Sequence, residues 1–357
     1  PVGIVKREGG NDVLFLNGRI RSYGDLPKLV NESRLSTVFK CQGEIAGVLF
    51  KVDTFQPVPV LATHQEYLRE FQANKNDIPE FDTTATLYNH LWEMVADIES
   101  MVTEDITLLK ASSKLAGEAR VQSGAYLVSP GQVYLGDGVE VYPGSVIDAS
   151  RGPVLIGPNT RIESHAAVHG PCFVGANSVV LAGKISQCSV GPTCRVGGEL
   201  EESILHSYVN KYHAGFIGHS CVGSWVNFGA MTTNSDLKNN YSSIRVSVGG
   251  KMIDTGAIKV GSFIGDHTKF GIGTLLNTGI NIGVCCNIFG GGLTSDKEIP
   301  SFRWGNTDRF HSYALDKALE TAQRTAERRH VTLALHEIEL LKIISQNGLT
   351  SSGALTW

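Results

Sequence analysis

Side chains suited to proton transfer and to binding polar groups are concentrated between Leu205 and Val246. Histidine has an unperturbed pKa near neutrality and is the commonest proton acceptor in enzymes. Asparagine both donates and accepts hydrogen bonds with hydroxyl groups, whereas lysine and arginine neutralise phosphates. This stretch therefore holds the densest set of chemically capable side chains in the sequence. Its members are Lys211, His213, His219, Asn227, Asn234, Lys238 and Arg245.

A six-residue repeat identifies the elements that must position these side chains. Such a period matches neither the stripe of a helix nor the alternation of a strand. Glycine often follows the repeated apolar residue, and a small residue often stands two positions before it, as sharp corners around a narrow interior require. We therefore expect a parallel β-coil built from short strands. Two runs carry the repeat: Ile156, Ile162, Val168, Val174 and Val180, then Ile264, Phe270, Leu276, Ile282 and Ile288.

The repeat is interrupted inside the polar stretch. The step from Ile217 to Val222 is five residues instead of six, and the segment Ala230–Arg245 becomes polar. This change predicts a loop that leaves the coil, and loops on a rigid scaffold commonly carry function.

Other polar residues fall on outward positions of the repeat. His165 and His169 flank the apolar residue Val168, and we expect both imidazoles on the surface. Arg195 follows an inward cysteine, so its side chain should also point outward. It is either a surface residue or a ligand-binding residue.

Composition and charge limit the kind of protein. The chain has 357 residues, enough for two domains, and its net charge of −4 with no long basic run argues against nucleic-acid binding. No apolar run has membrane-spanning length and no signal-peptide pattern opens the sequence, so we expect a cytoplasmic protein without a membrane partner. Seven cysteines without a CxxC pair argue against a disulfide framework and a zinc site. Four of them fall on the small inward position, where we expect them to pack as small hydrophobic residues: Cys172, Cys188, Cys194 and Cys286.

Three domains are predicted along the chain. Residues 1–110 read as an α/β domain with a linking helix at its end. Residues 111–305 contain the repeat and form the coil. Residues 306–357 contain two helices and a tail.

The elements outside the coil follow from local hydrophobic patterns. Short apolar runs predict strands at Val13–Asn17 and Glu44–Val52. Apolar residues at helical spacing predict a helix over Thr83–Met101 and two further helices over His311–Arg329 and Leu335–Ser345.

A family resemblance is carried by four segments: 208–220 (YVNKYHAGFIGHS), 225–241 (WVNFGAMTTNSDLKNNY), 265–269 (GDHTK) and 300–305 (PSFRWG). They resemble the bifunctional N-acetylglucosamine-1-phosphate uridyltransferase/glucosamine-1-phosphate acetyltransferase family, especially its bacterial relatives described as sugar-phosphate nucleotidyltransferases. The resemblance implies a left-handed parallel β-helix, an exception to the right-handed crossover rule. It also implies a homotrimeric acyltransferase that uses acetyl-CoA as co-substrate and acetylates an amino-sugar phosphate in nucleotide-sugar or cell-envelope biosynthesis.

The resemblance assigns roles to residues of the polar stretch. His213 matches the family histidine that takes a proton from the sugar amine as the amine attacks the acetyl thioester. Phe216 stands where the family has an aromatic residue with a hydroxyl group. Asn227 matches a substrate-binding asparagine. Asn234 and Lys238 resemble an asparagine and a lysine of the following loop.

Further positions are assigned to the two substrates in the same way. Lys211 and Arg195 are candidates to neutralise the sugar phosphate. The family's oxyanion donor is a backbone N–H near Ala230. Outer rungs around Asp266 and Gly290 would form the wall that holds the pantetheine arm of acetyl-CoA.

Three other functions fit parts of the sequence. A sugar-1-phosphate nucleotidyltransferase would need Mg²⁺ and a glycine-rich loop, but Arg19 stands where that family has a metal-binding Asp, and no such loop precedes Val13. A zinc enzyme of the carbonic anhydrase type would need three histidines converging between subunits. A trimeric scaffold without catalytic activity would keep the coil and bind no acetyl-CoA.

Overall fold

The chain divides into two compact units, the first ending at Met94 and the second beginning at Val95. The structure is a computed structural model, and it describes all residues except 1–2, 7–11, 52–77, 112–116, 308 and 347–357. The tail that ends the predicted third domain therefore lies outside the described residues. The predicted division near residues 110 and 305 stays a prediction.

The first unit is built on a mixed sheet with strand order β1-β2-β5-β4-β6. Phe39, Ala46 and Leu49 of this sheet pack with Leu26 of the helix α1. A small second sheet pairs β3 with β7. The elements are β1 (Gly3–Lys6), β2 (Val13–Leu16), β3 (Ile20–Ser22), α1 (Leu26–Glu32), β4 (Thr37–Cys41), β5 (Glu44–Phe50), β6 (Glu80–Asp82) and β7 (Thr86–Leu87).

The helix predicted over Thr83–Met101 begins later than expected. Thr83 and Thr84 are fixed instead by the Asp25 carboxylate, which accepts hydrogen bonds from the Thr83 hydroxyl (2.7 Å) and the Thr84 N–H (2.8 Å). The helical residues form α3 (Leu91–Ala96) and α4 (Ile98–Ala111). The hydrophobic pattern correctly predicted a helix in this segment. It could not reveal the long-range hydrogen bonds to Asp25 that keep Thr83 and Thr84 out of the helix.

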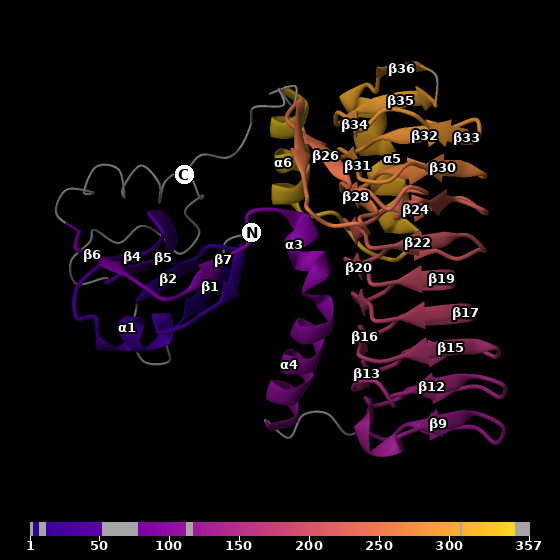
Figure 1. The fold of residues 1–357 in the computed structure, drawn as a ribbon, viewed down its shortest axis with the longest axis horizontal. Helices are drawn as coiled ribbons and strands as arrows, with labels where there is room; N and C mark the ends of the chain where they lie inside the picture. The colour runs from indigo at the N-terminus through magenta and orange to yellow at the C-terminus, as the bar shows by residue number, and fades with distance from the viewer. Residues whose placement is uncertain (1–2, 7–11, 52–77, 112–116, 308, 347–357) are drawn as a thin grey trace. The chain divides into compact units, whose positions relative to one another are not determined.

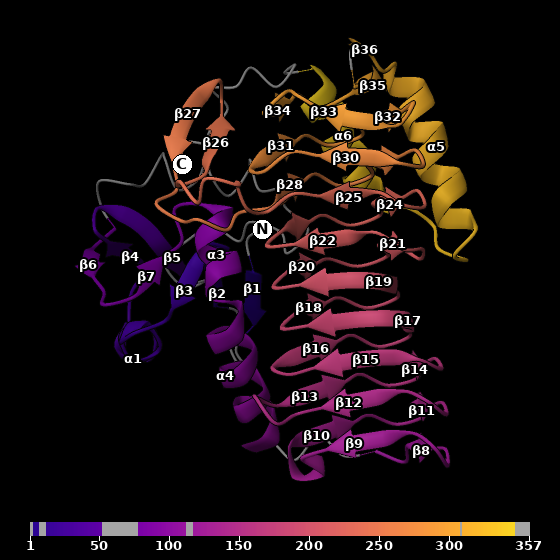
Figure 2. The ribbon, with the colours of Figure 1, turned by 45° about the vertical axis from the view of Figure 1, so that its right-hand side comes forward.

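The second unit is a parallel β-coil whose strands stack rung upon rung (Figures 1 and 2). Each turn contributes strands to three faces. The first face contains β10 (Val133–Leu135), β13 (Val154–Ile156), β16 (Cys172–Val174), β18 (Ser189–Val190), β20 (Ile204–Leu205), β23 (Cys221–Val222), β28 (Ser262–Ile264), β31 (Ile280–Ile282) and β34 (Glu298–Ile299).

The second and third faces meet in two long strands, β17 (Val179–Ser186) and β19 (Arg195–Glu201), which run through both. The second face otherwise contains β8 (Arg120–Val121), β11 (Glu140–Val141), β14 (Arg161–Ile162), β21 (Asn210–Lys211), β24 (Asn227–Phe228), β29 (Lys269–Phe270), β32 (Asn287–Phe289), β35 (Arg303–Asn306) and the antiparallel β36 (Arg309–Ser312). The third contains β9 (Tyr126–Val128), β12 (Val146–Asp148), β15 (Ala166–His169), β22 (Phe216–Gly218), β25 (Thr233–Asn234), β30 (Thr274–Leu276) and β33 (Gly292–Thr294).

The repeated apolar residues fill the interior, as the six-residue period predicts. Ile156, Ile162, Val168, Val174 and Val180 are all fully buried in one continuous core. Burial of aliphatic side chains on this scale is the main source of the coil's stability. The four inward cysteines are buried in the same core as free thiols. The predicted fold class, an α/β part followed by a left-handed parallel β-helix and C-terminal helices, is thus confirmed.

A polar excursion leaves the coil between β25 and β28, as the interrupted repeat predicts. It begins after Asn234 rather than at Ala230, because residues 229–234 still form a corner and a strand of the coil. The excursion carries an antiparallel hairpin of β26 (Arg245–Val248) and β27 (Lys251–Asp254), which projects from the stack in Figure 2. Its turn is fixed to the coil because the Glu298 carboxylate accepts hydrogen bonds from the hairpin's Ser247, Gly249 and Gly250.

Three helices cover parts of the coil. Ile98, Val102 and Ile106 of α4 pack on outward residues of the first face, including Leu155. Towards the other end, α5 (Leu315–Glu327) and α6 (Leu335–Gln346) pack on outward residues of the corner between the first and second faces. The helix predicted from His311 begins at Leu315, because residues 309–312 form β36 instead. Within the described residues, we find no helix with the length and apolar character needed to cross a bilayer.

Candidate functional site

His213 lies in a corner of the coil between the second and third faces. This corner, Tyr212–Gly215, joins β21 to β22, and we call it the His213 corner. The next corner above it, Gly229–Thr232, joins β24 to β25 and is bound to it by a hydrogen bond from Met231 N–H to the Ala214 carbonyl (2.9 Å). The predicted general base and the predicted oxyanion donor therefore occupy stacked corners of adjacent rungs.

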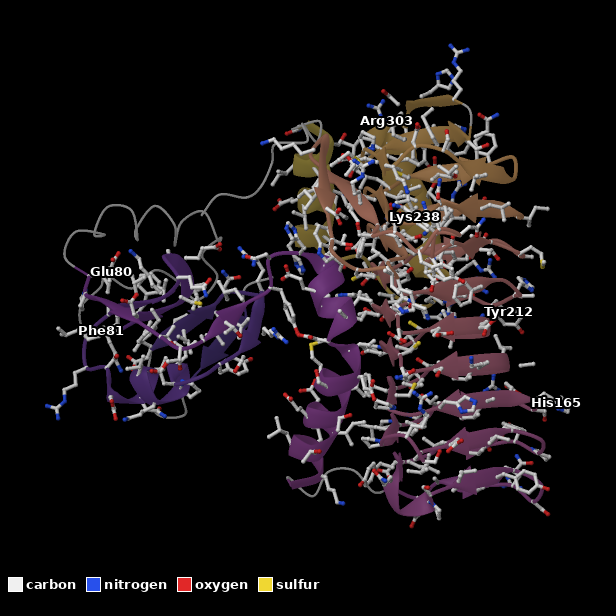
Figure 3. The ribbon with its side chains drawn as sticks, in the orientation of Figure 1. Glu80, Phe81, His165, Tyr212, Lys238 and Arg303 are labelled. Atoms are coloured by element: carbon white, nitrogen blue, oxygen red, sulfur yellow. The ribbon has the colours of Figure 1, made fainter. Side chains whose placement is uncertain are left out.

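The His213 side chain is exposed, and its ring makes an edge contact with Tyr212 at a centroid separation of 5.1 Å. Figure 3 labels Tyr212 at the edge of the stack, on the same side as His165, which occupies the equivalent corner of a lower rung. An exposed imidazole on a fixed backbone is free to accept a proton from a bound molecule.

A buried lysine holds the backbone of this corner. Lys211 occupies an inward position of β21, in register with Val196 below, and only 1% of its surface is exposed. Its ammonium group donates to the carbonyl oxygens of His213 (2.5 Å) and Gly197 (3.2 Å). Burial lowers the pKa of Lys211 to about 8. The ammonium group is not available to a surface ligand, so the geometry does not support the predicted role of Lys211 in phosphate binding.

The corner above His213 presents an unused backbone donor. Gly273 N–H binds the Ala230 carbonyl (2.9 Å), and Thr232 N–H closes the turn on the Gly229 carbonyl (3.2 Å). Within the described part of the chain, no acceptor is recorded for Ala230 N–H. This N–H can therefore donate to a developing oxyanion, as expected of such a group. Met231 beside it has a left-handed backbone, with φ of 64°, and a largely exposed side chain.

The faces on either side of the corner place polar and aromatic groups near it. On the second face, Asn227 lies in register with Asn210 and accepts a hydrogen bond from its side-chain amide (2.7 Å). Arg195 follows on the same face, one rung below Asn210, and is exposed. On the third face, Phe216 is half-buried directly after the His213 corner.

Asn234 is turned into the coil. It is 2% exposed, its amide oxygen accepts from Gly218 N–H (2.9 Å), and its amide nitrogen donates to the Gly218 carbonyl (2.9 Å) and the Ser220 hydroxyl (3.1 Å). These bonds use both N–H donors and the oxygen of a buried amide whose interior position otherwise carries an apolar residue. The geometry therefore favours a structural role and does not support the prediction that Asn234 binds substrate.

Lys238 lies in the excursion, between β25 and β26 (Figure 3). Its ammonium group donates to the Ser243 carbonyl (2.5 Å), and the side chain is half-buried. The charges of Lys238 and Arg245, together with the larger effect of burial, lower the pKa of Lys297. Asp254 lies among these cations and accepts a hydrogen bond from Ser243, so its carboxylate offsets part of their positive charge.

The two residues predicted for the pantetheine wall lie on different corners. Gly290 lies between β32 and β33, in the same corner column as His213 and Ala230. Asp266 lies between β28 and β29, in the column between the first and second faces, where its carboxylate accepts from Ser224 N–H (2.7 Å). One continuous wall on a single chain therefore cannot contain both residues.

The sequence interpretation did not identify a buried ion triad beside the excursion. The His219 ring lies between Asp236 (Nδ1 to Oδ2, 2.7 Å) and Glu202 (Nε2 to Oε2, 3.2 Å). Burial alone would lower the pKa of His219, but the hydrogen bonds and charges of these two carboxylates outweigh burial and raise it to about 9. The imidazolium ties the first residues of the excursion to the coil. Successive members of the triad lie one rung apart in the sequence. This regular spacing is the signal that could have revealed them.

No metal site is evident in what the structure describes. Within those residues, no three His, Cys, Asp or Glu side chains are arranged to hold a metal ion. A zinc site between subunits, as the carbonic anhydrase alternative requires, is not tested by a single chain.

Comparisons with known proteins give partial matches. No family model matches the chain. A bifunctional sugar-1-phosphate nucleotidylyltransferase/acetyltransferase of Sulfurisphaera tokodaii is 33% identical over 97 residues, which cover 27% of this chain and 24% of that protein. A bifunctional protein GlmU of Carboxydothermus hydrogenoformans is 26% identical over 224 residues, covering 54% of this chain and 44% of that protein. The chain thus spans less than half the length of these relatives.

Solved structures add little beyond these sequence matches. A putative acetyltransferase of Bacillus cereus aligns with 65% of this chain and 97% of its own, at 13% identity and a TM-score of 0.24. A UDP-N-acetylglucosamine acyltransferase of Campylobacter jejuni aligns with 58% of this chain and 88% of its own, at 13% identity and a TM-score of 0.21. Scores this low carry no argument here. Over part of its length, the chain is similar to bifunctional sugar-1-phosphate nucleotidylyltransferase/acetyltransferases.

Proposed function

We propose that this protein is an acyltransferase that moves an acetyl group from acetyl-CoA to the amine of an amino-sugar phosphate resembling glucosamine-1-phosphate. The observation that carries the proposal is the stacking of the exposed His213 corner beneath the corner that offers Ala230 N–H. A proton acceptor and an oxyanion donor on adjacent rungs are the two groups that acyl transfer to an amine requires. The names of the sequence relatives support the same activity.

The reaction follows from these groups. The sugar amine attacks the thioester carbonyl carbon, and His213 takes a proton from the nitrogen as the C–N bond forms. Ala230 N–H stabilises the negative charge on the carbonyl oxygen of the tetrahedral intermediate. The intermediate collapses with cleavage of the C–S bond, and the proton held by His213 passes to the leaving thiolate. The products are the acetylated amino sugar and free CoA.

The neighbouring residues hold the two substrates. Asn227 and the ring of Phe216 contact the sugar, and Arg195 and Lys238 neutralise its phosphate. Gly290, in the column of His213, adjoins the acetyl-CoA arm. Lys211 acts indirectly, because its ammonium group fixes the His213 carbonyl.

The active assembly is a homotrimer in the cytoplasm. Acetyl-CoA lies in a groove between the coils of two subunits, and Asp266 reaches that groove from a different subunit than Gly290. This arrangement is compatible with the two residues lying on different corners. An intact assembly would have three times the 38.4 kDa mass of the chain in light scattering.

Two alternatives have weaker support. Nucleotidyl transfer needs Mg²⁺ at the position of Arg19, but that guanidinium group pairs with Glu44 (2.6 Å) and donates to the Tyr88 carbonyl (2.6 Å). It therefore has a structural role in the first unit. A trimeric scaffold without activity would keep every coil contact described above, and only an assay separates it from an enzyme.

The test is release of free thiol from acetyl-CoA with glucosamine-1-phosphate as acceptor, with the acetylated product identified by mass. Acceptor-dependent release supports the proposal. Pyrophosphate release from UTP with acetylated sugar phosphate and Mg²⁺ would instead support nucleotidyl transfer. No reaction with any amino-sugar phosphate, in a protein that assembles as a trimer, would favour the scaffold.

A further inference from the structure

A cavity of about 250 Å³ lies between the coil and the C-terminal helices. It is formed where α6 and the residues before it cover the corner between the first and second faces, away from the corner column of His213. Ligand pockets commonly begin at about 300 Å³, so this volume suits a molecule of one ring or a short chain.

One wall of the cavity is a ladder of flat rings. Tyr208 and Trp225 stack at 3.9 Å with an angle of 5°, and Trp225 lies nearly parallel to His267 at 6.1 Å. All three residues have left-handed backbones at equivalent corners of successive rungs, with φ of 62°, 64° and 62°. The repeat therefore aligns their rings, and Leu341 and Val331 close the apolar part of the cavity from the helical side.

The polar part of the cavity is acidic. Asp266 stands at the rim, and its pKa is raised by burial and by the nearby charge of Glu337, which also lines the cavity. None of the described lining residues is Lys or Arg. Lys269, which acts on His267 electrostatically, donates to the Trp225 carbonyl instead and does not line the cavity.

Hydrogen-bonding capacity in this cavity is not used up within the chain. His267 is 8% exposed, and its Nδ1 has no hydrogen-bond partner. Of the two Asp266 carboxylate oxygens, Oδ1 accepts from Ser224 N–H, whereas no partner is recorded for Oδ2 in the described part of the chain. A buried polar atom without a partner, such as His267 Nδ1, is uncommon in a folded protein, and the exposed Asp266 carboxylate leaves Oδ2 open to a bound molecule.

We propose that this cavity binds a small organic cation, a primary amine or guanidinium carried on a flat or short apolar body. The carboxylates of Asp266 and Glu337 hold the charge, and the ring ladder with Leu341 holds the body. A ligand that touches both the coil and α6 stabilises their contact, because binding to the folded form alone raises its stability. The cavity shares Asp266 with the acetyl-CoA groove proposed above, but cation binding measured without acetyl-CoA tests it independently of acetyl transfer.

The test uses benzylamine, with benzyl alcohol and benzoate as neutral and anionic matches, measured by calorimetry on the full chain. We expect benzylamine alone to bind. We expect Glu337→Gln, which retains an acceptor for Ala334 N–H, to weaken binding about tenfold, or about 1.4 kcal/mol. Asp266→Asn should act similarly, and Glu339→Gln, an exposed residue of the same helix, should leave binding unchanged.

Two results would overturn the proposal. Equal binding of all three probes would mean that the cavity recognises only apolar bulk. Absence of benzylamine binding at millimolar concentration, in a protein whose melting temperature shows that it is folded, would mean that the cavity takes no such cation. Since Glu337→Gln and Asp266→Asn act on different elements, failure of one variant to fold still leaves the other as a test.

Discussion

The lower and central rungs of the coil share one fold but differ in what their inward positions contain. In the lower rungs these positions are aliphatic, as with Ile156 and Ile162, and no residue between β10 and β16 leaves the stack for a long excursion. In the central rungs the same positions hold Lys211 and Asn234, both buried. Lys211 bonds the His213 carbonyl, and Asn234 bonds Gly218 at the end of β22. The difference indicates that the coil accepts polar interior residues where their side chains bond the backbone of neighbouring rungs, and Lys211 does so at the His213 corner.

The largest expected effect tests the regular rungs. Ile162→Ala removes three carbon atoms from a fully buried site and should lower the free energy of unfolding by about 2 to 5 kcal/mol. Ile272→Ala makes the same substitution at a position that is 73% exposed. It should change the free energy of unfolding by less than about 0.5 kcal/mol. Urea unfolding measures both, and equal effects would contradict the assignment of the interior.

The second expected effect tests the ion triad at the base of the excursion. His219→Gln leaves Glu202 and Asp236 without their shared cation and should destabilise the protein by about 2 kcal/mol near neutral pH, less than a fully buried pair because Glu202 is partly exposed.

This loss depends on pH. The folded pKa of His219, about 9, exceeds its ordinary 6.5, so its contribution is complete below 6.5 and disappears as the pH rises through 9. The pKa values of Asp236 and Glu202 are lowered by His219, although burial opposes this at Asp236, so their contribution disappears as the pH falls through their folded values. The difference between parent and variant should therefore be widest just below pH 6.5. A constant difference up to pH 9 would contradict the triad.

The third expected effect tests the buried lysine. Lys211→Met keeps a linear side chain, one atom shorter, but removes a buried charge that has no carboxylate partner, so near neutral pH its stability should lie within about 1 kcal/mol of the parent. The folded pKa of about 8 lies below the ordinary 10.5, so the parent should gain stability relative to the variant as the pH rises from 8 to 10.5. Lys184→Met, at an exposed site, should show no such change.

The smallest expected effect tests the corner above His213. Met231 has a left-handed backbone that glycine adopts without steric strain, so Met231→Gly should stabilise the protein by up to about 1 kcal/mol. Met231→Ala retains the Cβ atom and the strain and should be nearly neutral. Thermal melting of both variants checks this, and a loss of stability on introducing glycine would show that the Met231 side chain makes a contact that outweighs the strain.

Much of the fold could be predicted because a narrow coil forces one apolar residue inward at every sixth position. The same six-residue spacing also predicts two polar interior residues, which the sequence interpretation did not recognise. Counting six from Leu205 reaches Lys211, and counting six from Phe228 reaches Asn234, so the repeat itself places both side chains inside. The family resemblance instead assigned Lys211 and Asn234 to substrate binding.

Other features had no local signal. The start of the helix after residue 90 depends on hydrogen bonds between Asp25 and residues 58 and 59 positions later. The cavity beside Trp225 depends on how α6 packs on a coil corner, which neither segment reveals alone.

The central claim is that the His213 corner carries the chemistry, and two histidines at equivalent corners allow a direct test. His165 and His213 are both exposed and both lie between the second and third faces. The decisive measurement is kcat/KM for acetyl transfer in His213→Asn and His165→Asn, with trimer and fold verified for each. We predict a loss of about 10² to 10⁴-fold for His213→Asn, typical of a removed general base, and no loss for His165→Asn. Equal activity in both variants would contradict the account.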